Sequence, residues 1–307
     1  MQLANRTATT LLSSLFFKPN LLTCSLDSTL NYHTMPAPVI AVCHGGGPMP
    51  ILGDPGHAQL IKSMSTTVPK ILGLGTANAP RAIVLVTAHW SATRPTISNG
   101  SRHKLYYDYG GFPPEAYSVK YDAPGSPEVA QEVFEVLNKA GLKPRMDGER
   151  GWDHGVFVPM TLINPRADIP IVQLSVLTSA SPAQHFAMGR ALASLRVSNV
   201  AILGSGMATF HNLRMMFSGA LNDGAVQKRN KQWSETLTET LKIKNNVERE
   251  ESFEGWRGWV GAKEAHPQGG EEHFMPLLVC AGAGGDKSAE DFQDEIMDMK
   301  QSTYYWT

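Results

Sequence analysis

Three histidines in this chain stand at the end of a short apolar run or just beyond one. His44 follows PVIAVC, His89 follows AIVLVTA, and His211 lies five residues beyond VAILGSG. Near-continuous apolar runs of this length are typical of strands buried on both faces of a sheet. Ligands of open α/β sheets bind beyond the carboxyl ends of the strands, so these imidazoles are expected to point into one crevice. Because imidazoles buried together without partners cost desolvation free energy, the pattern suggests a metal site.

Two further histidines lie in polar or glycine-bearing segments. His154 stands in GWDHGVFVPM, and His273 stands in EAHPQGGEEHFMPLL beside Glu271 and Glu272, with His266 close by. The second segment therefore offers three adjacent candidate ligands, although a glutamate pair is also common at the start of a helix. We interpret the remaining histidines as surface or helix residues: His33, His57, His103 and His185.

The absence of several catalytic motifs from the sequence reduces the number of reaction types to consider. The sequence contains no HExxH, no CxxC pair and no GxSxG elbow, and the GGGP that follows His44 lacks the GK[ST] of a phosphate loop. The glycines at 45–47 are instead expected to turn the backbone sharply and leave space for a substrate above a metal. Several imidazoles without cysteine suit Zn(II) or Fe(II), and few carboxylates argue against Mg²⁺ or Ca²⁺. The residues alone therefore predict a metal enzyme.

Composition excludes several other classes of protein. The 307 residues are 42% hydrophobic and 18% charged, with a net charge of −1 and no basic stripe, which argues against nucleic-acid binding. No run approaches the roughly 20 apolar residues of a membrane span. Cys24, Cys43 and Cys280 are too widely spaced for a zinc pair or a disulfide framework, so a reducing, cytoplasmic location is expected.

The first 35 residues differ from the rest. They are rich in Ser, Thr and Leu, carry Arg6 and Lys18, and have no acidic residue before Asp27. This composition resembles a weak mitochondrial transit peptide, but two basic residues are few for one. We favour a disordered or loosely docked extension with Met35 as a possible second start, followed by a catalytic domain at 36–307.

The pattern of apolar runs predicts a single α/β domain. We expect a mixed, largely buried central sheet flanked by helices, with the metal site beyond the strand ends. The expected strands are 38–43, 82–88, 169–177, 200–206 and 276–283. The expected helices are 126–141, 182–195 and 227–241. Three loops are long enough to carry function: 45–56, 108–127 and 144–159.

Seven segments together resemble one family. They are VCHGGGPMP, VTAHWSA, DYGGFPPEAYSVKYDAPGSPEVA, GWDHGVFVPM, IPIVQLSV, GSGMATFHNLR and HPQGGEEHFMPLL. In this order they resemble the class III extradiol ring-cleavage dioxygenases, in the branch of the 4,5-DOPA dioxygenases, from about Pro36 to Gly285. The sequence departs from the family in two places. HGGGP replaces the usual HGSP, and His273 stands where the protocatechuate-cleaving branch has a glutamate, with Glu271 and Glu272 as fallback ligands.

The resemblance implies a role for each histidine of these motifs. It implies that His44, His89 and His273 are metal ligands, and that His211 is the acid/base or a fourth ligand. His154 would hydrogen-bond the substrate. We also expect three residues to line the substrate pocket: His266, Tyr109 and Trp90.

The activity that the resemblance implies is ring opening. A catechol-type, DOPA-like substrate and O₂ would give a ring-opened semialdehyde, with Fe(II) expected for activity and Zn(II) able to occupy the site in purified protein. The alternatives are a zinc-dependent hydrolase built on the same histidines, or a non-catalytic binding relative of the fold. We expect a monomer or small homo-oligomer, without a nucleic-acid or membrane partner.

Overall fold

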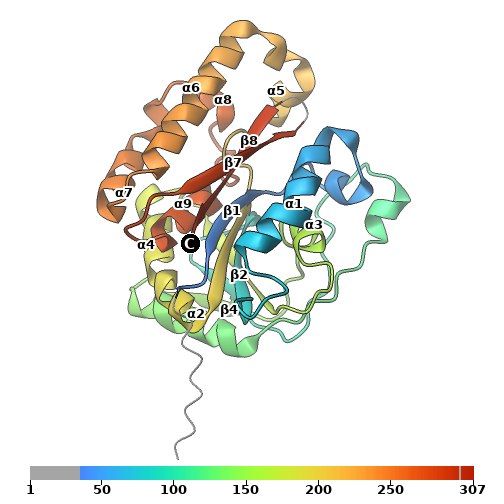
Figure 1. The fold of residues 1–307 in the computed structure, drawn as a ribbon, viewed down its shortest axis with the longest axis vertical. Helices are drawn as coiled ribbons and strands as arrows, with labels where there is room; N and C mark the ends of the chain where they lie inside the picture. Colours follow the sequence, from blue (N-terminus) through green and yellow to red (C-terminus); the bar gives the residue numbers. More distant parts are fainter. Residues whose placement is uncertain (1–34, 297–298) are drawn as a thin grey trace, which may run out of the picture. The chain divides into compact units, whose positions relative to one another are not determined.

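The computed structural model describes residues 35–296 and 299–307, and these belong to one compact unit, His33–Thr307. The predicted N-terminal extension, except for Met35, lies outside the described residues. Within them, eight strands form a single mixed sheet in the order β4-β3-β5-β2-β6-β1-β8-β7 (Figure 1). The strands are β1 (Val39–Cys43), β2 (Ala82–Ala92), β3 (Thr96–Ser98), β4 (Arg145–Asp147), β5 (Ile171–Leu177), β6 (Val200–Gly206), β7 (Glu290–Ile296) and β8 (Met299–Trp306).

The centre of this sheet is parallel. Strands β5, β2, β6 and β1 run in the same direction, so their carboxyl ends meet at one edge. The outer strand β8 pairs antiparallel with β1, and β7 pairs antiparallel with β8. The sequence analysis made no prediction for this C-terminal pair of strands, but the predicted mixed sheet with flanking helices is confirmed.

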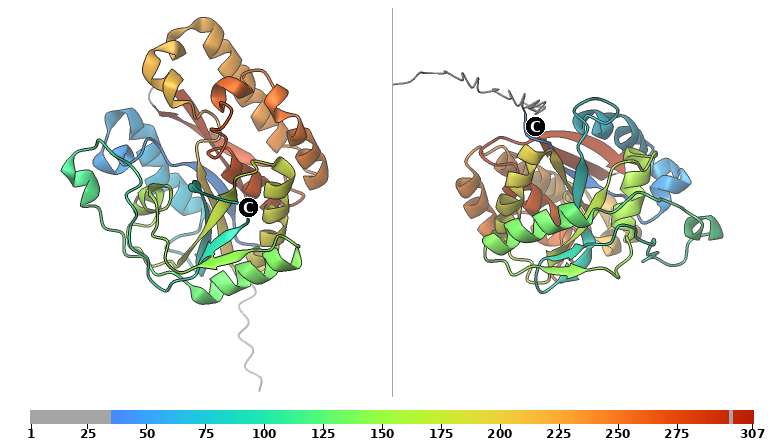
Figure 2. Two further views of the ribbon diagram at one scale, coloured as in Figure 1. Left: turned by 180° about the vertical axis from the view of Figure 1, so that it is seen from behind. Right: turned by 90° about the horizontal axis from the view of Figure 1, so that it is seen from below.

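Helices cover both faces of the sheet because its central strands are apolar on both sides. In β1, Val39 and Ala41 pack in one hydrophobic cluster while Ile40 and Val42 pack in the other, as the two-residue period of a strand requires. Viewed from behind, the helices of the two faces lie on opposite sides of the sheet (Figure 2). They are α1 (Ala58–Ile71), α2 (Pro127–Lys139), α3 (His154–Ile163), α4 (Pro182–Leu192), α5 (Leu213–Ser218), α6 (Gly224–Leu241), α7 (Asn246–Glu254), α8 (Ala262–Ala265) and α9 (Met275–Ala283).

Helix α2 begins and ends at the residues that the sequence indicated. The Ser126 side chain accepts a hydrogen bond from the Val129 N–H, Pro127 is the first helical residue, and Gly141 beyond the C-terminus has a φ of 77°. The predicted helices at 182–195 and 227–241 correspond to α4, which ends in a 3₁₀ turn, and to α6.

One predicted strand is wrong. Residues 276–283 form helix α9, whose side chains are all buried. A short apolar run has no helical or strand period when every side of it is buried, so the pattern could not separate the two structures. Pro276 near the helix start and the scarcity of β-branched residues in PLLVCAGA are the signals that favour a helix. The predicted loop at 144–159 likewise contains β4 and the start of α3.

Two further expectations concern membranes and thiols. Within residues 35–296 and 299–307, no helix has both the length and the apolar character needed to cross a membrane. Cys43 and Cys280 are buried free thiols.

The buried His185 predicts a pH dependence of stability. Its Nε2 accepts a hydrogen bond from the Leu177 N–H, and burial lowers its pKa from 6.5 to about 4. Between pH 6.5 and about 4, His185 therefore binds a proton in the unfolded chain but not in the folded chain. We expect the free energy of unfolding to fall by about 2–3 kcal/mol from this group as the pH drops from 7 to 4.5.

The test of this expectation is urea unfolding at both pH values for the wild type and for His185→Gln. The glutamine keeps an acceptor for the Leu177 N–H but does not titrate, so its loss of stability at pH 4.5 should be smaller. Equal losses in the two proteins would contradict the role given to His185.

Candidate metal centre

The carboxyl edge of the parallel strands gathers five histidines. His44 follows β1, His89 lies near the end of β2, and His211 comes after β6. His154 is the first residue of α3, and His273 lies just before α9. Because β2, β6 and β1 are neighbours in the sheet, their ends bring residues that are far apart in sequence to one place.

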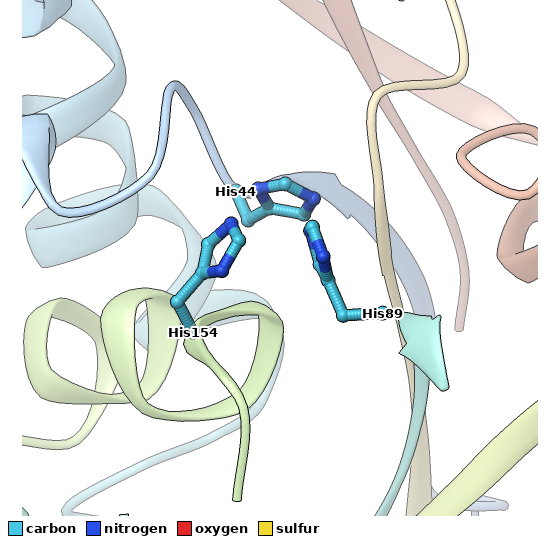
Figure 3. A group of neighbouring side chains, drawn as sticks. All are labelled: His44, His89 and His154. Atoms are coloured by element: carbon cyan, nitrogen blue, oxygen red, sulfur yellow. The ribbon is translucent and has the colours of Figure 1, made fainter. Parts of the chain in front are cut away.

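The imidazoles face one another at short distances. The ring centroids of His44 and His89 are 5.0 Å apart, and those of His89 and His154 are 3.8 Å apart. Figure 3 shows these three side chains pointing toward a common centre from β1, β2 and α3. On the other side of His89, its Nε2 lies 3.2 Å from Nε2 of His273. The His211 ring stacks on His273 with a centroid separation of 3.4 Å.

The outer ring nitrogens of these histidines are held by oxygen acceptors. His44 Nδ1 donates to the Gly45 carbonyl at 2.9 Å, and His273 Nδ1 donates to the Glu272 carboxylate at 2.8 Å. Asp108 lies 3.2 Å from His89 Nδ1 and 2.8 Å from His154 Nδ1. A proton held at Nδ1 leaves the Nε2 lone pair free, which is how proteins prepare histidines for metal binding.

The donor atoms fit a transition metal. Two ligands at the usual metal–nitrogen distance lie about 2.9–3.4 Å from each other, and the 3.2 Å between Nε2 of His89 and of His273 falls in this range. Nε2 of His44 is buried without a hydrogen-bond partner among the described residues. A buried nitrogen of this kind is costly unless something binds it.

Two sets of three side chains bring ligand atoms within 4.8 Å of one another. One set is His44, His89 and His154, and the other is His211, Glu272 and His273. The sets adjoin at the contact between His89 and His273. The predicted ligands His44, His89 and His273 are therefore brought together, and the predicted catalytic residues His211 and His154 flank them.

Burial favours the neutral form of His44, His154, His211 and His273 by lowering the pKa of each. It lowers the pKa of His44 and of His273 well below 6.5, and neighbouring histidines lower them further. Burial likewise lowers the pKa of His154 and brings that of His211 to about 4. Burial alone would raise the pKa of Asp108, but hydrogen bonds from His154 and His89 outweigh it and hold this carboxyl below its usual range. Neutral imidazoles are the form that binds a metal.

Asp108 and His57 are site residues that the sequence analysis did not identify. Asp108 begins the quoted segment DYGGF and accepts from both His89 and His154. His57, interpreted from the sequence as a surface or helix residue, is fully buried. Its Nε2 accepts from the Gly46 N–H at 3.0 Å and its Nδ1 donates to Asp54 at 2.7 Å, so it holds the glycine loop in place.

The glycine loop at 45–47 accounts for part of the segment VCHGGGPMP. Gly45 has a φ of 80°, and a Cβ there would lie 2.6 Å from Cγ of Pro50. Both facts require glycine directly after the ligand candidate His44. A Cβ at Gly46 would meet only ordinary contacts, so a serine fits this position.

Gly45→Ala is therefore expected to disturb the site. The substitution forces an unfavourable φ and a steric clash, which together cost about 1–3 kcal/mol. Thermal unfolding and metal content measure the effect. Gly224→Ala is the matched control, because a Cβ at Gly224 meets nothing within 4 Å, and it should change neither quantity. An unchanged Tm in Gly45→Ala would contradict this interpretation.

The histidines open into a cavity of about 760 Å³. The expected pocket residue Tyr109 lines it, with its hydroxyl donating to the Ala116 carbonyl at 2.6 Å. Burial raises the pKa of Tyr109 to about 12, so its phenol stays protonated at neutral pH. The other described residues that line it are His44, Gly45, Gly46, Gly47, Met49, Ala88, His89, Ser91, Gly110, Phe112, His154, Met207, His211, Leu213, Met216, Phe217, Glu272 and His273.

Trp90 and His266, which were expected in the pocket, are not among the described residues that line this cavity. The Trp90 ring instead packs against Arg150, whose guanidinium carbon lies 4.9 Å from the ring centroid. His266 is fully buried, with Nε2 donating to the Ala208 carbonyl and its ring packed against Trp233 and Phe274.

The two glutamates have different roles. Glu272 supports His273 through the hydrogen bond to Nδ1. Glu271 forms an ion pair with Arg257. Neither needs to be a ligand for three imidazoles to meet at one point.

Comparison with known proteins decides the family. Residues 42–304 match the family described as the catalytic LigB subunit of aromatic ring-opening dioxygenase. The chain belongs to this family. The LigB match spans most of the chain and includes all five histidines of the site.

Named relatives of this LigB-family chain agree with the match. The chain is 50% identical over 280 residues to the dioxygenase tasH of Hapsidospora irregularis, covering 88% of this chain and 85% of that one. It is 35% identical over 236 residues to a 4,5-DOPA dioxygenase extradiol of Beta vulgaris, covering 74% and 83%. The crystal structure of an uncharacterized protein from Escherichia coli K12 superposes with a TM-score of 0.66 at 28% identity, covering 88% and 100%.

LigB membership confirms the resemblance to the class III extradiol dioxygenases. It makes the protein an oxygenase of the aromatic ring-opening kind. LigB dioxygenases depend on a metal, and the converging histidines give this chain a place to bind one.

Proposed function

We propose that this LigB-family protein is an extradiol dioxygenase that opens the ring of a catechol. The observation that supports the proposal best is the set of cavity-lining imidazoles whose Nδ1 atoms are held by oxygen acceptors. In the reaction one ring carbon–carbon bond beside the diol breaks and both atoms of O₂ enter the semialdehyde product. The ring supplies the electrons, so no further reductant is needed.

His44, His89 and His273 would hold the metal, for which we propose Fe(II). When bound, Fe(II) would supply a binding point for the catechol oxygens and a redox link between the ring and O₂. Three neutral protein ligands leave coordination positions for both reactants. The His211 ring stacks on His273 and so lies beside this set.

The two remaining histidines, His154 and His211, would accept and donate protons. His154 donates from Nδ1 to Asp108, so its Nε2 is an acceptor for a catechol hydroxyl in the cavity. Neither ring nitrogen of His211 has a hydrogen-bond partner among the described residues, whereas its backbone N–H donates to Ala265. We assign His211 as the acid/base, because its ring is free to accept and return a proton at the cavity wall.

The test is oxygen consumption by protein loaded anaerobically with Fe(II). Addition of a catechol should start O₂ uptake and form a yellow semialdehyde, and the Zn(II)-loaded protein should do neither. Absence of turnover over a panel of catechols, with iron content verified, would refute the proposal.

The same experiment separates the alternatives. A zinc hydrolase would act on ester or amide substrates with Zn(II) and ignore O₂. A non-catalytic relative would bind a partner and turn over nothing with either metal. LigB membership and the dioxygenase relatives favour the oxygenase over both.

A further inference from the structure

The cavity has an apolar wall in addition to its histidines. This wall is made mainly by Met49, Phe112, Met207, Leu213, Met216 and Phe217. Three of these residues come from α5, at positions i, i+3 and i+4. This spacing places Leu213, Met216 and Phe217 on one face of the helix.

This helix face is unusually exposed for its composition. Leu213 is 52% exposed and Phe217 is 70% exposed, although both border the cavity. Large apolar side chains left in water beside a binding cavity are often covered by the ligand. A substrate that reaches α5 would bury part of this apolar surface.

The charges of the side chains that line the cavity also favour an apolar ligand. None of the described residues that line it is a lysine or an arginine. Among the described lining residues the only carboxylate belongs to Glu272, which already accepts a hydrogen bond from His273. A carboxylate on the substrate side chain would therefore meet no cationic side chain among the described lining residues, and the Glu272 carboxylate would repel it. An unpaired charge in such a place is costly.

Arg214 is the cation nearest in sequence to this wall. It is exposed and follows Leu213 on α5, about 100° around the helix from the apolar face. It is not among the described residues that line the cavity.

The cavity is also larger than one catechol ring requires, which leaves space for a substituent on the ring.

From these observations we infer that the substrate is a catechol with an uncharged, apolar side chain, and that Leu213, Met216 and Phe217 select it. The inference rests on the proposed function for the position of the catechol ring. It predicts that an amino-acid substrate such as DOPA is a poor one for this protein.

The test uses four catechols that share a three- or two-carbon side chain and differ in charge. They are 4-propylcatechol, which is neutral, 3-(3,4-dihydroxyphenyl)propionate, dopamine and DOPA. With the Fe(II)-loaded protein, kcat/KM for 4-propylcatechol should exceed that for each of the three charged catechols by at least about tenfold. Equal or higher kcat/KM for DOPA would overturn the inference and leave the proposed dioxygenase activity standing.

Binding provides a second readout that does not need turnover. Anaerobic calorimetric titration of the metal-loaded protein should give at least about tenfold tighter binding of 4-propylcatechol than of DOPA. If the protein binds in this order but opens no ring, the proposed function fails while the inferred ligand class stands. If DOPA binds as tightly as 4-propylcatechol, the inference fails whatever the activity.

Two variants on α5 test whether this helix determines which catechol the protein prefers. Phe217→Lys places a cation on the apolar face at an exposed position, so the variant should fold normally. Its kcat/KM for the propionate, relative to that for 4-propylcatechol, should rise by about tenfold. Arg214→Ala should leave all four values unchanged. A loss of kcat/KM confined to the two carboxylate-bearing catechols in Arg214→Ala would show that Arg214 recognises a carboxylate, and would overturn the inference.

Discussion

His273→Ala is expected to bind metal at least about 100-fold more weakly than the wild type, whereas His154→Ala should retain its metal and lose rate. The reason is the geometry at His89. Its Nε2 lies 3.2 Å from that of His273, and the Nδ1 of His273 is already held by Glu272. Removing one of three protein ligands takes away a large part of the binding free energy of the metal.

The measurement is the iron content of each variant after anaerobic loading and dialysis, together with the oxygen-uptake rate. His103→Ala is the matched control. His103 is a partly buried histidine whose ring nitrogens bond to the Arg150 and Gly100 carbonyls, and it is not among the described cavity residues. It should keep both metal and activity.

This pair of variants also decides between the two possible ligand sets. The candidate ligand atoms of His44, His89 and His154 lie within 4.8 Å of one another, so the geometry allows either arrangement. Loss of metal in His154→Ala together with retention in His273→Ala would assign the ligands as His44, His89 and His154. Our assignment of His273 would then be wrong.

The sequence was most informative where strand ends carry histidine. Near-continuous apolar runs placed β1, β2 and β6 within a few residues, and the rule that ligands bind beyond parallel strands predicted that His44, His89 and His211 lie together. His273 was identified as a site residue from its segment and its motif. For these residues the local sequence contains the relevant signal.

The supporting residues could not be found in this way. Asp108 is 46 positions from His154, and its hydrogen bonds depend on how the loop after β3 folds back over the sheet edge. His57 looked like a surface histidine because nothing local shows that it faces Gly46. Trp90 and His266 were expected in the pocket because they stand near site histidines, but Trp90 packs against Arg150 and His266 packs in a buried aromatic cluster.

Asp108→Asn is expected to reduce activity by about 10–100-fold, the usual effect of removing a carboxylate that supports a metal-binding histidine. The carboxylate accepts from the backbone N–H of His154 at 2.9 Å and from the Nδ1 atoms of His154 and His89. An asparagine has one acceptor oxygen, and its amide N–H₂ would face one of these donors. If it faces His89, that ring must move its proton to Nε2, where the lone pair for the metal is needed.

The variant separates two contributions of Asp108. Weaker metal binding would show that the His89 tautomer matters most, and normal metal content with a lower kcat would show that the support of His154 matters most. Asp122→Asn is the matched control, since Asp122 is 87% exposed and pairs with Arg102 at the surface. Both proteins can be measured in one loading and oxygen-uptake experiment. If Asp108→Asn matched this control in metal content and rate, the carboxylate would not set the protonation of either histidine, and their orientation would depend on packing against the strand ends alone.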